Sequence, residues 1–235
     1  TQNKRLNRKN THKNRRLKNT RKYKNKRIRG GAAQALSFNI QNADMFQKRF
    51  TNACITGDII EVQFLLQNVD KLGQAASNII NKPEINGYTP LHLACYNGQF
   101  TVVAVLLTDR RVDVNPISQT ASGYTPLHLA CYAGQFTVVA VLLANERVEV
   151  NQATTDNGST PLLIACQVGH VDIVQLLLKH AATDVNKAMT NDGVTPLFIA
   201  CQNGHNEVVA LLLSKYMTNV NQAANDDGAT PLFMA

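Results

Sequence analysis

Regularly spaced cysteines are the first feature of this sequence that could carry chemistry. Five of them each follow an alanine, at Cys54, Cys95, Cys131, Cys166 and Cys201. None belongs to the closely spaced pairs that are typical of zinc or redox sites. Helices in contact lie about 8–10 Å apart, whereas a disulfide needs Cα atoms within about 7 Å. We therefore expect unbridged cysteines that fill space between helices.

Histidines recur in the same periodic way. His92 and His128 occupy equivalent places in two similar segments, and so do His170 and His205. This wide spacing argues against shared metal ligation and favours hydrogen bonds between turns. No Ser/His/Asp arrangement, paired carboxylates or phosphate-binding glycine loop stands out. The sequence thus predicts no catalytic residue, no metal site and no cofactor, and the protein is not expected to be an enzyme.

A fixed period organises most of the chain. Threonine-proline pairs begin at residues 89, 125, 160, 195 and 230, so their spacings are 36, 35, 35 and 35 residues. A constant period of about 20–50 residues indicates a stacked array of similar units. Segments 87–107 and 123–143 differ only at Asn97 and Ala133, which indicates an internal duplication.

Each unit predicts two short helices. Thr89 can cap a helix whose first residue, Pro90, needs no backbone donor. Gly98 can end that helix by adopting a positive φ. Valines and leucines at helical spacing over residues 102–107 then give a second helix with one apolar face. Such a hairpin cannot bury its apolar face alone, so the copies must stack.

Asparagines that follow valine recur between the units. We expect their side chains to bind the backbone of the loops. These residues are Asn115, Asn151, Asn186 and Asn221.

The unit resembles the ankyrin repeat, whose signature is T-P-L-H-x-A at a period of about 33 residues. Residues 89–94 and 125–130 match this signature in full, whereas 160–165 and 195–200 lack the histidine. The family's Gly-His before the second helix begins at Gly169 and Gly204 but is Gly-Gln at Gly98 and Gly134. The resemblance covers about residues 44–235. It implies an all-α solenoid of helix-turn-helix units joined by turn loops.

The repeats divide the body of the chain. Five complete repeats are predicted over residues 44–86, 87–122, 123–157, 158–192 and 193–227, and residues 228–235 are expected to be the truncated start of a further repeat. The first repeat is degenerate. Thr51 and Asn52 make its first helix more polar, as a terminal repeat with one solvent-facing side requires.

Charge divides the chain into a tail and a body. Residues 1–29 contain 14 of the 24 Lys and Arg residues and none of the 16 Asp and Glu residues. Such asymmetry indicates an interaction tail, not one uniformly basic domain. Few apolar residues lie between these charges, so we expect residues 1–31 to form a disordered Lys/Arg/Asn-rich arm.

Three functions are compatible with the basic arm: a nuclear import signal, contact with nucleic acid or another anionic surface, and a solubilising tail. Import or anion binding would use Arg15, Arg16, Lys24, Lys26 and Arg27. The arm's partner would then be an import receptor or a nucleic acid. If the arm serves import or anion binding, the alternative function of the chain is that of a nuclear or nucleic-acid-associated regulatory protein.

No segment of the sequence predicts a membrane span or a secretory signal. The longest apolar run, residues 138–144, is far shorter than the roughly 20 residues that cross a bilayer. The N-terminal region has no apolar core segment of the kind that signal peptides contain. We expect an intracellular monomer of the cytoplasm or nucleus that does not bind membranes.

The ankyrin resemblance implies that turn loops and first helices form a concave groove that holds a partner protein. The residue between Gly and Thr, and the two residues after Ala-Cys, are expected to face it. The predicted partner-binding residues are Tyr88, Tyr96, Asn97, Tyr124, Tyr132, Ser159, Gln167, Val168, Val194, Gln202 and Asn203. Tyrosine gives a large contact area at low entropic cost. The predicted function is therefore a non-catalytic protein-protein interaction scaffold.

Deletion of residues 1–29 tests whether the arm and the body act independently. Circular dichroism should show nearly unchanged helical content and melting temperature, because we expect Gly30 and Gly31 to form a flexible junction. If the arm binds nucleic acid, a titration with DNA or RNA should lose its steep salt dependence on deletion. A large loss of melting temperature would show instead that the arm docks on the acidic body.

Overall fold

The computed structural model describes residues 43–72, 78–84, 87–224 and 228–234 as α-helices and connecting loops, with no strand in these ranges. The predicted helical solenoid is thereby confirmed, whereas the predicted N-terminal arm lies outside the described residues. The helices are α2 (Ala43–Thr56), α3 (Ile59–Asn68), α4 (Pro90–Tyr96), α5 (Phe100–Thr108), α6 (Pro126–Tyr132), α7 (Phe136–Leu143), α8 (Pro161–Val168), α9 (Val171–Lys179), α10 (Pro196–Gln202), α11 (Asn206–Leu213) and α12 (Pro231–Met234), with 3-10 turns η1 (Val69–Leu72) and η3 (Ile79–Asn81).

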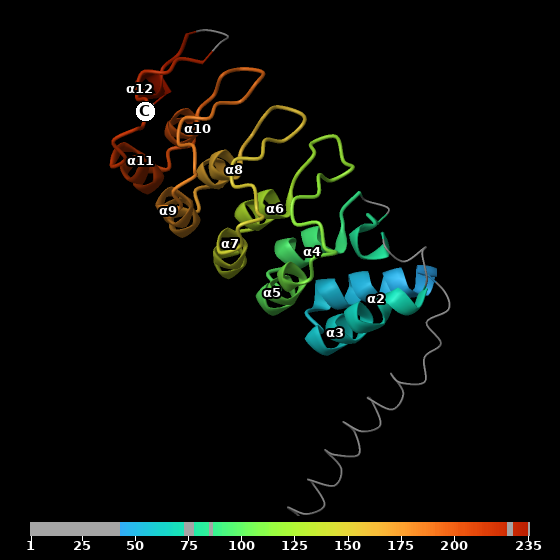
Figure 1. The fold of residues 1–235 in the computed structure, drawn as a ribbon. Helices are drawn as coiled ribbons and strands as arrows, with labels where there is room; N and C mark the ends of the chain where they lie inside the picture. The colour runs from blue at the N-terminus through green and yellow to red at the C-terminus, as the bar shows by residue number, and fades with distance from the viewer. Residues whose placement is uncertain (1–42, 73–77, 85–86, 225–227, 235) are drawn as a thin grey trace, which may run out of the picture. The chain divides into compact units, whose positions relative to one another are not determined.

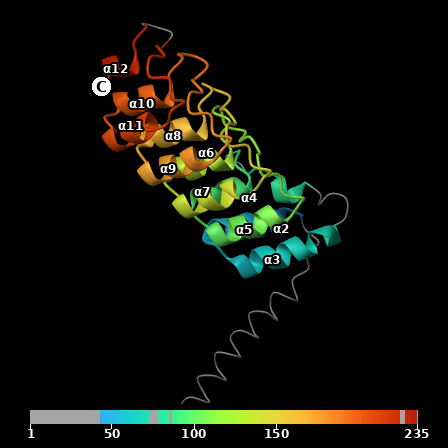
Figure 2. The ribbon, with the colours of Figure 1, turned by 60° about the vertical axis from the view of Figure 1, so that its left-hand side comes forward.

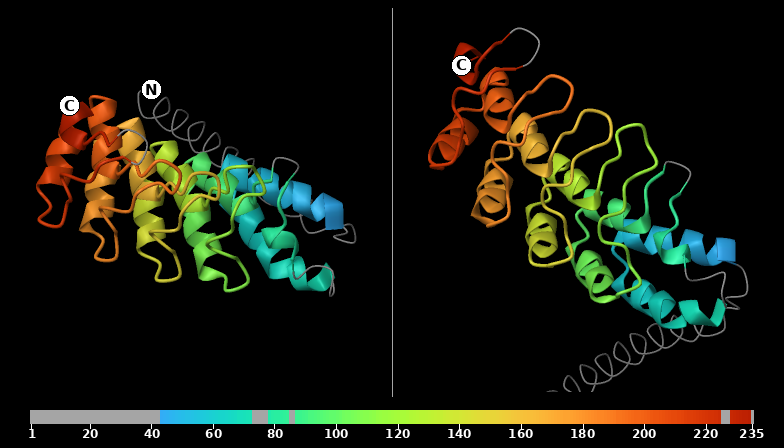
Figure 3. Two further views of the ribbon diagram at one scale, coloured as in Figure 1. Left: turned by 90° about the horizontal axis from the view of Figure 1, so that it is seen from above. Right: turned by 45° about the horizontal axis from the view of Figure 1, so that its top comes forward.

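Residues 43–235 form one compact unit in which the helices alternate between two layers. The first layer contains α2, α4, α6, α8, α10 and α12, and each packs against the next (Figure 1). The second layer contains α3, α5, α7, α9 and α11, stacked in the same order (Figure 2). The loops that join one pair to the next lie side by side along the first layer (Figure 3).

Threonine hydroxyls begin the first-layer helices. Each accepts a hydrogen bond from the backbone N–H three residues later, and a proline follows in the first helical turn, as the sequence predicts. The capping threonines are Thr89, Thr125, Thr160 and Thr195. In α4 and α6 a histidine completes the cap, because the backbone N–H of the threonine donates to the histidine Nδ1 at 3.1 Å.

The core lies between the two layers. In α5, Val102, Val103 and Leu106 are buried, and the apolar residues of α7 and α9 repeat this pattern. All five cysteines are free and buried at the end of the first-layer helices. Their predicted role as small space-filling residues is therefore confirmed.

Asparagine amides join consecutive loops. The Nδ2 of Asn115 donates to the Arg147 carbonyl at 2.6 Å, and its Oδ1 accepts from the Glu149 N–H at 2.9 Å. Asn151 and Asn186 make the same pair of bonds to the following loop. Each amide thus satisfies two backbone groups of its neighbour, which confirms the predicted role of these three residues.

Histidine rings join consecutive repeats in the first layer. Because the Nδ1 of His92 accepts from Thr89, its Nε2 carries the proton and donates to the Tyr124 carbonyl at 2.8 Å. His128 makes the equivalent bond to the Ser159 carbonyl at 3.0 Å. These bonds confirm the predicted contacts between turns.

Helix α2 differs from the expectation for a terminal repeat. Thr51 is buried, and its hydroxyl donates to the Glu84 carboxylate at 2.7 Å. Gln47 is also buried, and its side chain donates to the Lys82 carbonyl at 3.2 Å. The prediction that Thr51 faces solvent is wrong, because the segment before the second repeat covers this side of α2. Asn52 is exposed, as predicted.

Burial of two histidines predicts a pH-dependent stability. Burial lowers the pKa of His92 to about 4 and that of His128 to about 4, from an unperturbed value of about 6.5. Between these values the unfolded chain binds protons that the folded chain does not. Their contribution to the free energy of unfolding is therefore complete above about pH 6.5 and is lost as the pH falls toward 4.

Urea unfolding at pH 7 and pH 5 measures this effect. The parent should lose about 1–2 kcal/mol per buried histidine between the two values. The matched variant is His92→Leu with His128→Leu, because Leu163 occupies the equivalent position in α8. Its stability should change much less with pH. Equal pH dependence in both proteins would contradict the assignment.

Candidate functional site

Four tyrosines from two consecutive repeats line one hollow on the loop side of the first layer. Tyr88 and Tyr124 immediately precede the capping threonines, and Tyr96 and Tyr132 end α4 and α6. Together with Leu93 and Leu129 they enclose a cavity of about 480 Å³. We call this cavity the tyrosine groove. It brings together residues that are 36 positions apart in the sequence.

Tyr88 and Tyr124 form the loop side of the tyrosine groove. Their rings pack against histidine rings of the same repeat, with centroids 5.6 Å from His92 and 5.9 Å from His128. Both tyrosines are half-buried, and burial raises the pKa of the Tyr124 hydroxyl. The Tyr124 carbonyl accepts from the Ser118 N–H at 2.8 Å in addition to His92. This side of the groove is therefore fixed by both backbone and ring contacts.

Tyr96 and Tyr132 form the helix side of the tyrosine groove and are 47% and 54% exposed. The Tyr96 carbonyl accepts from Gln135 Nε2 at 3.1 Å. The Tyr132 carbonyl accepts from His170 Nε2 at 3.3 Å. Each tyrosine is thus held by the next repeat, while its ring remains accessible.

The Gly-Gln and Gly-His pairs of the sequence are interchangeable at this position. Gln99 donates to the Ile55 carbonyl at 2.9 Å, and His205 bonds to the Gln167 carbonyl at 3.1 Å. The glycine of the preceding repeat permits the approach of each glutamine or histidine. Gly134 has φ of 71°, and a Cβ there would lie 2.9 Å from the His170 ring. Glutamine therefore replaces histidine without loss of the contact between repeats.

The other predicted partner-binding residues lie in repeats two to five, and their side chains differ in solvent exposure. Those that follow the Ala-Cys pair of each repeat are exposed, but they do not line the tyrosine groove. They are Asn97, Gln167, Val168, Gln202 and Asn203.

Ser159 and Val194 are buried, so the expectation that their side chains face a partner is wrong. The Ser159 N–H donates to the Thr154 hydroxyl at 2.9 Å. Val194 packs in a hydrophobic cluster with Phe198 of α10 and Ala224. Short side chains at this position end beneath the neighbouring loop, whereas a tyrosine is long enough for its hydroxyl end to reach the groove.

Leu93 and Leu129 also line the groove, whereas the sequence predicts only that they lie in helices. Each precedes the helix-terminal tyrosine by three positions, and residues three apart share one face of a helix. That spacing was the signal available in the sequence. The two leucines give the groove an apolar component beside the phenol rings.

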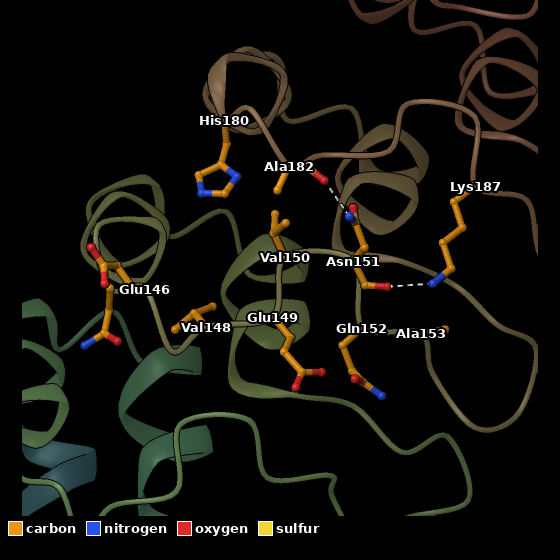
Figure 4. Close-up of a pocket in the computed structure, with 11 residues that line it drawn as sticks. Glu146, Val148, Glu149, Val150, Asn151, Gln152, Ala153, His180, Ala182 and Lys187 are labelled. Carbon is orange, nitrogen blue, oxygen red and sulfur yellow. Dashed lines mark hydrogen bonds between the residues drawn. The ribbon is translucent and has the colours of Figure 1, made fainter.

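A second hollow, of about 740 Å³, lies at the turns between the third and fourth repeats (Figure 4). Its polar groups include Asn151, whose side chain donates to the Ala182 carbonyl, and Lys187, whose Nζ donates to the Asn151 carbonyl at 2.9 Å. Glu149 points away from His180 (Figure 4). These bonds hold consecutive turns together, and the carboxylate and the imidazole do not converge on one point.

The cysteines and histidines are poorly placed for catalysis. Burial raises the pKa of the thiols of Cys54, Cys131 and Cys166, and a thiol that stays protonated is a weak nucleophile. His92 and His128 use both ring nitrogens in structural hydrogen bonds. Within the described ranges, no group of three His, Cys, Asp or Glu side chains is close enough to hold a metal ion.

Comparison with known families identifies the repeat. The family model described as ankyrin repeats (3 copies) matches residues 29–118, 50–153, 111–189 and 181–235. The chain belongs to the ankyrin-repeat family. Ankyrin repeats generally mediate protein-protein interactions and are typically non-catalytic. A comparison with curated protein sequences finds no significant match.

Two further predictions concern the arm and membranes. The basic residues Arg15, Arg16, Lys24, Lys26 and Arg27 lie outside the described residues. Among the helices that the structure describes, none has both the length and the apolar character needed to cross a membrane.

Proposed function

We propose that this ankyrin-repeat chain is a non-catalytic scaffold that binds a partner protein through the tyrosine groove. The observation that carries the proposal is the convergence of four tyrosines on one cavity. Tyrosine is enriched among the residues that dominate binding energy at protein interfaces. A cavity of several hundred cubic ångströms can accept side chains or a short peptide segment.

The fixed backbone of the groove supports this proposal. Neighbouring side chains hold the carbonyls of Tyr96, Tyr124 and Tyr132. A binding surface that is already ordered loses less conformational entropy when the partner arrives. The groove therefore suits binding without prior rearrangement.

The second and third repeats also expose aromatic side chains outside the groove. Phe100 and Phe136, which begin α5 and α7, are 46% and 48% exposed. The equivalent position of α11 is the polar Asn206. Exposed apolar side chains are available for contact with a partner. The second and third repeats therefore form the centre of the proposed interface.

We further propose that the chain is not an enzyme and acts inside the cell, in the cytoplasm or nucleus. The protonated, buried thiols and the structural use of His92 and His128 support the first part. Five unpaired cysteines support the second, since disulfides are rare in the reducing cytosol and nucleus. Anion binding by residues 1–29 is a separate proposal that rests on their charge.

Alanine substitution of the groove tyrosines tests the scaffold proposal. A partner is first captured with the repeat body and purified, and its affinity for each variant is then measured by calorimetry. Tyr96→Ala and Tyr132→Ala should each weaken binding by roughly 1–3 kcal/mol and change the free energy of unfolding by less than about 0.5 kcal/mol. Tyr88→Ala and Tyr124→Ala should weaken binding similarly but cost more stability, because these rings pack on histidines.

A control keeps the measurement specific. Tyr216 is 99% exposed and does not line the groove. Tyr216→Ala should leave affinity unchanged. Parental affinity in folded Tyr96→Ala and Tyr132→Ala variants would rule out the groove as the binding site.

A further inference from the structure

The chemistry of the tyrosine groove restricts what it can bind. Its six lining residues are tyrosines and leucines, so none carries a charge at neutral pH. No hydrogen bond among the described residues uses the hydroxyls of Tyr88, Tyr96 or Tyr132. The groove therefore combines apolar surface with phenol donors that have no partner within the described protein. A ligand must supply apolar groups and hydrogen-bond acceptors together.

We propose that the segment recognised by this groove is an uncharged, proline-rich stretch of the partner in the polyproline II conformation. The inference rests on the proposed function and names the partner's chemistry. Proline has a carbonyl acceptor but no backbone N–H. A polyproline II segment has no internal hydrogen bonds, so its carbonyls are free to accept from the tyrosine hydroxyls. Its rings supply the apolar surface that packs on the tyrosines and leucines.

Other backbone conformations complement the groove less well. A partner helix already satisfies its carbonyls internally, so the phenol hydroxyls would be covered without acceptors from its backbone. An extended strand brings a backbone N–H at every residue, and the groove is lined by side chains, not by a free sheet edge. Buried polar groups left without partners oppose binding. The proline-rich segment avoids both costs.

The repetition of the groove tyrosines in two stacked repeats suits a polyproline II ligand. Tyr88 and Tyr96 belong to one repeat, and Tyr124 and Tyr132 occupy the same positions in the next. Packed helices lie about 8–10 Å apart, and one three-residue turn of polyproline II rises about 9 Å. Ligand residues three apart can therefore meet equivalent tyrosine pairs. Segments 87–107 and 123–143 are nearly identical, which makes the two subsites alike.

Charge at the groove argues against an acidic segment. None of the six lining residues is charged, and the Asp156 carboxylate acts on the Tyr124 hydroxyl from outside this lining and helps to raise its pKa. A buried charge without a counter-ion is costly. A neutral ligand therefore matches the groove better than an acidic one.

Fluorescence anisotropy with three labelled dodecapeptides tests this inference on the full chain. The probe consists of Pro-Pro-Leu repeats, which place one leucine on the same face of each turn. In the second peptide alanine replaces proline, and in the third arginine replaces leucine. The probe should bind saturably, and both other peptides should bind at least tenfold more weakly. Absence of probe binding, or equal binding of the alanine peptide, would overturn the inference.

Tyrosine-to-phenylalanine variants test the role of the hydroxyls separately. Tyr96→Phe with Tyr132→Phe keeps the rings and removes two donors, and should weaken probe binding several-fold. Tyr216→Phe is the matched control and should have no effect. Parental binding by the double variant would contradict donation to the ligand's carbonyls.

The results also separate this inference from the proposed function. If a captured partner depends on the groove tyrosines but the proline-rich probe does not bind, the scaffold proposal stands and the ligand chemistry is wrong. If neither the partner nor the probe depends on the tyrosines, both proposals fail.

Discussion

Contact between consecutive repeats is the interaction on which the structure depends. A single pair of short helices leaves its apolar faces open, and stacking on neighbours closes them. Three sets of polar contacts recur at this interface: the asparagine amides between loops, the His92 and His128 bonds, and the Gln or His that follows each glycine. Each hydrogen bond of this kind contributes about 0.5–1.5 kcal/mol net to the free energy of unfolding. Their regular recurrence fixes how one repeat is placed on the next.

The same interface shapes the tyrosine groove. Its two halves belong to different repeats, and only stacking brings Tyr88 and Tyr96 beside Tyr124 and Tyr132. The groups that stabilise the stack also hold the groove: His92 binds the Tyr124 carbonyl, and His170 binds the Tyr132 carbonyl. The binding surface is therefore not a separate addition to the fold. Its geometry follows from the contacts that make the repeats stable.

Features that depend on local sequence could be predicted, and features that depend on the path of a loop could not. The threonine caps, the two helices of each repeat and the asparagine bonds follow from residue types at fixed positions. The burial of Ser159 and Val194 depends on side-chain length beneath a neighbouring loop, and that of Thr51 on the contact with Glu84. Leu93 and Leu129 were predicted in helices, but their place in the groove required the adjacent repeat.

Contacts between repeats position the groove, and a comparison of His170→Ala with His205→Ala tests this dependence most directly. Both side chains bond to a carbonyl of the preceding repeat, but His170 holds Tyr132 whereas His205 holds Gln167, which does not line the groove. Calorimetry with the partner captured by the repeat body should show weaker binding to the His170→Ala variant and parental affinity for the His205→Ala variant. Both substitutions should lower the free energy of unfolding by similar small amounts. Equal affinities for the two variants would contradict the account.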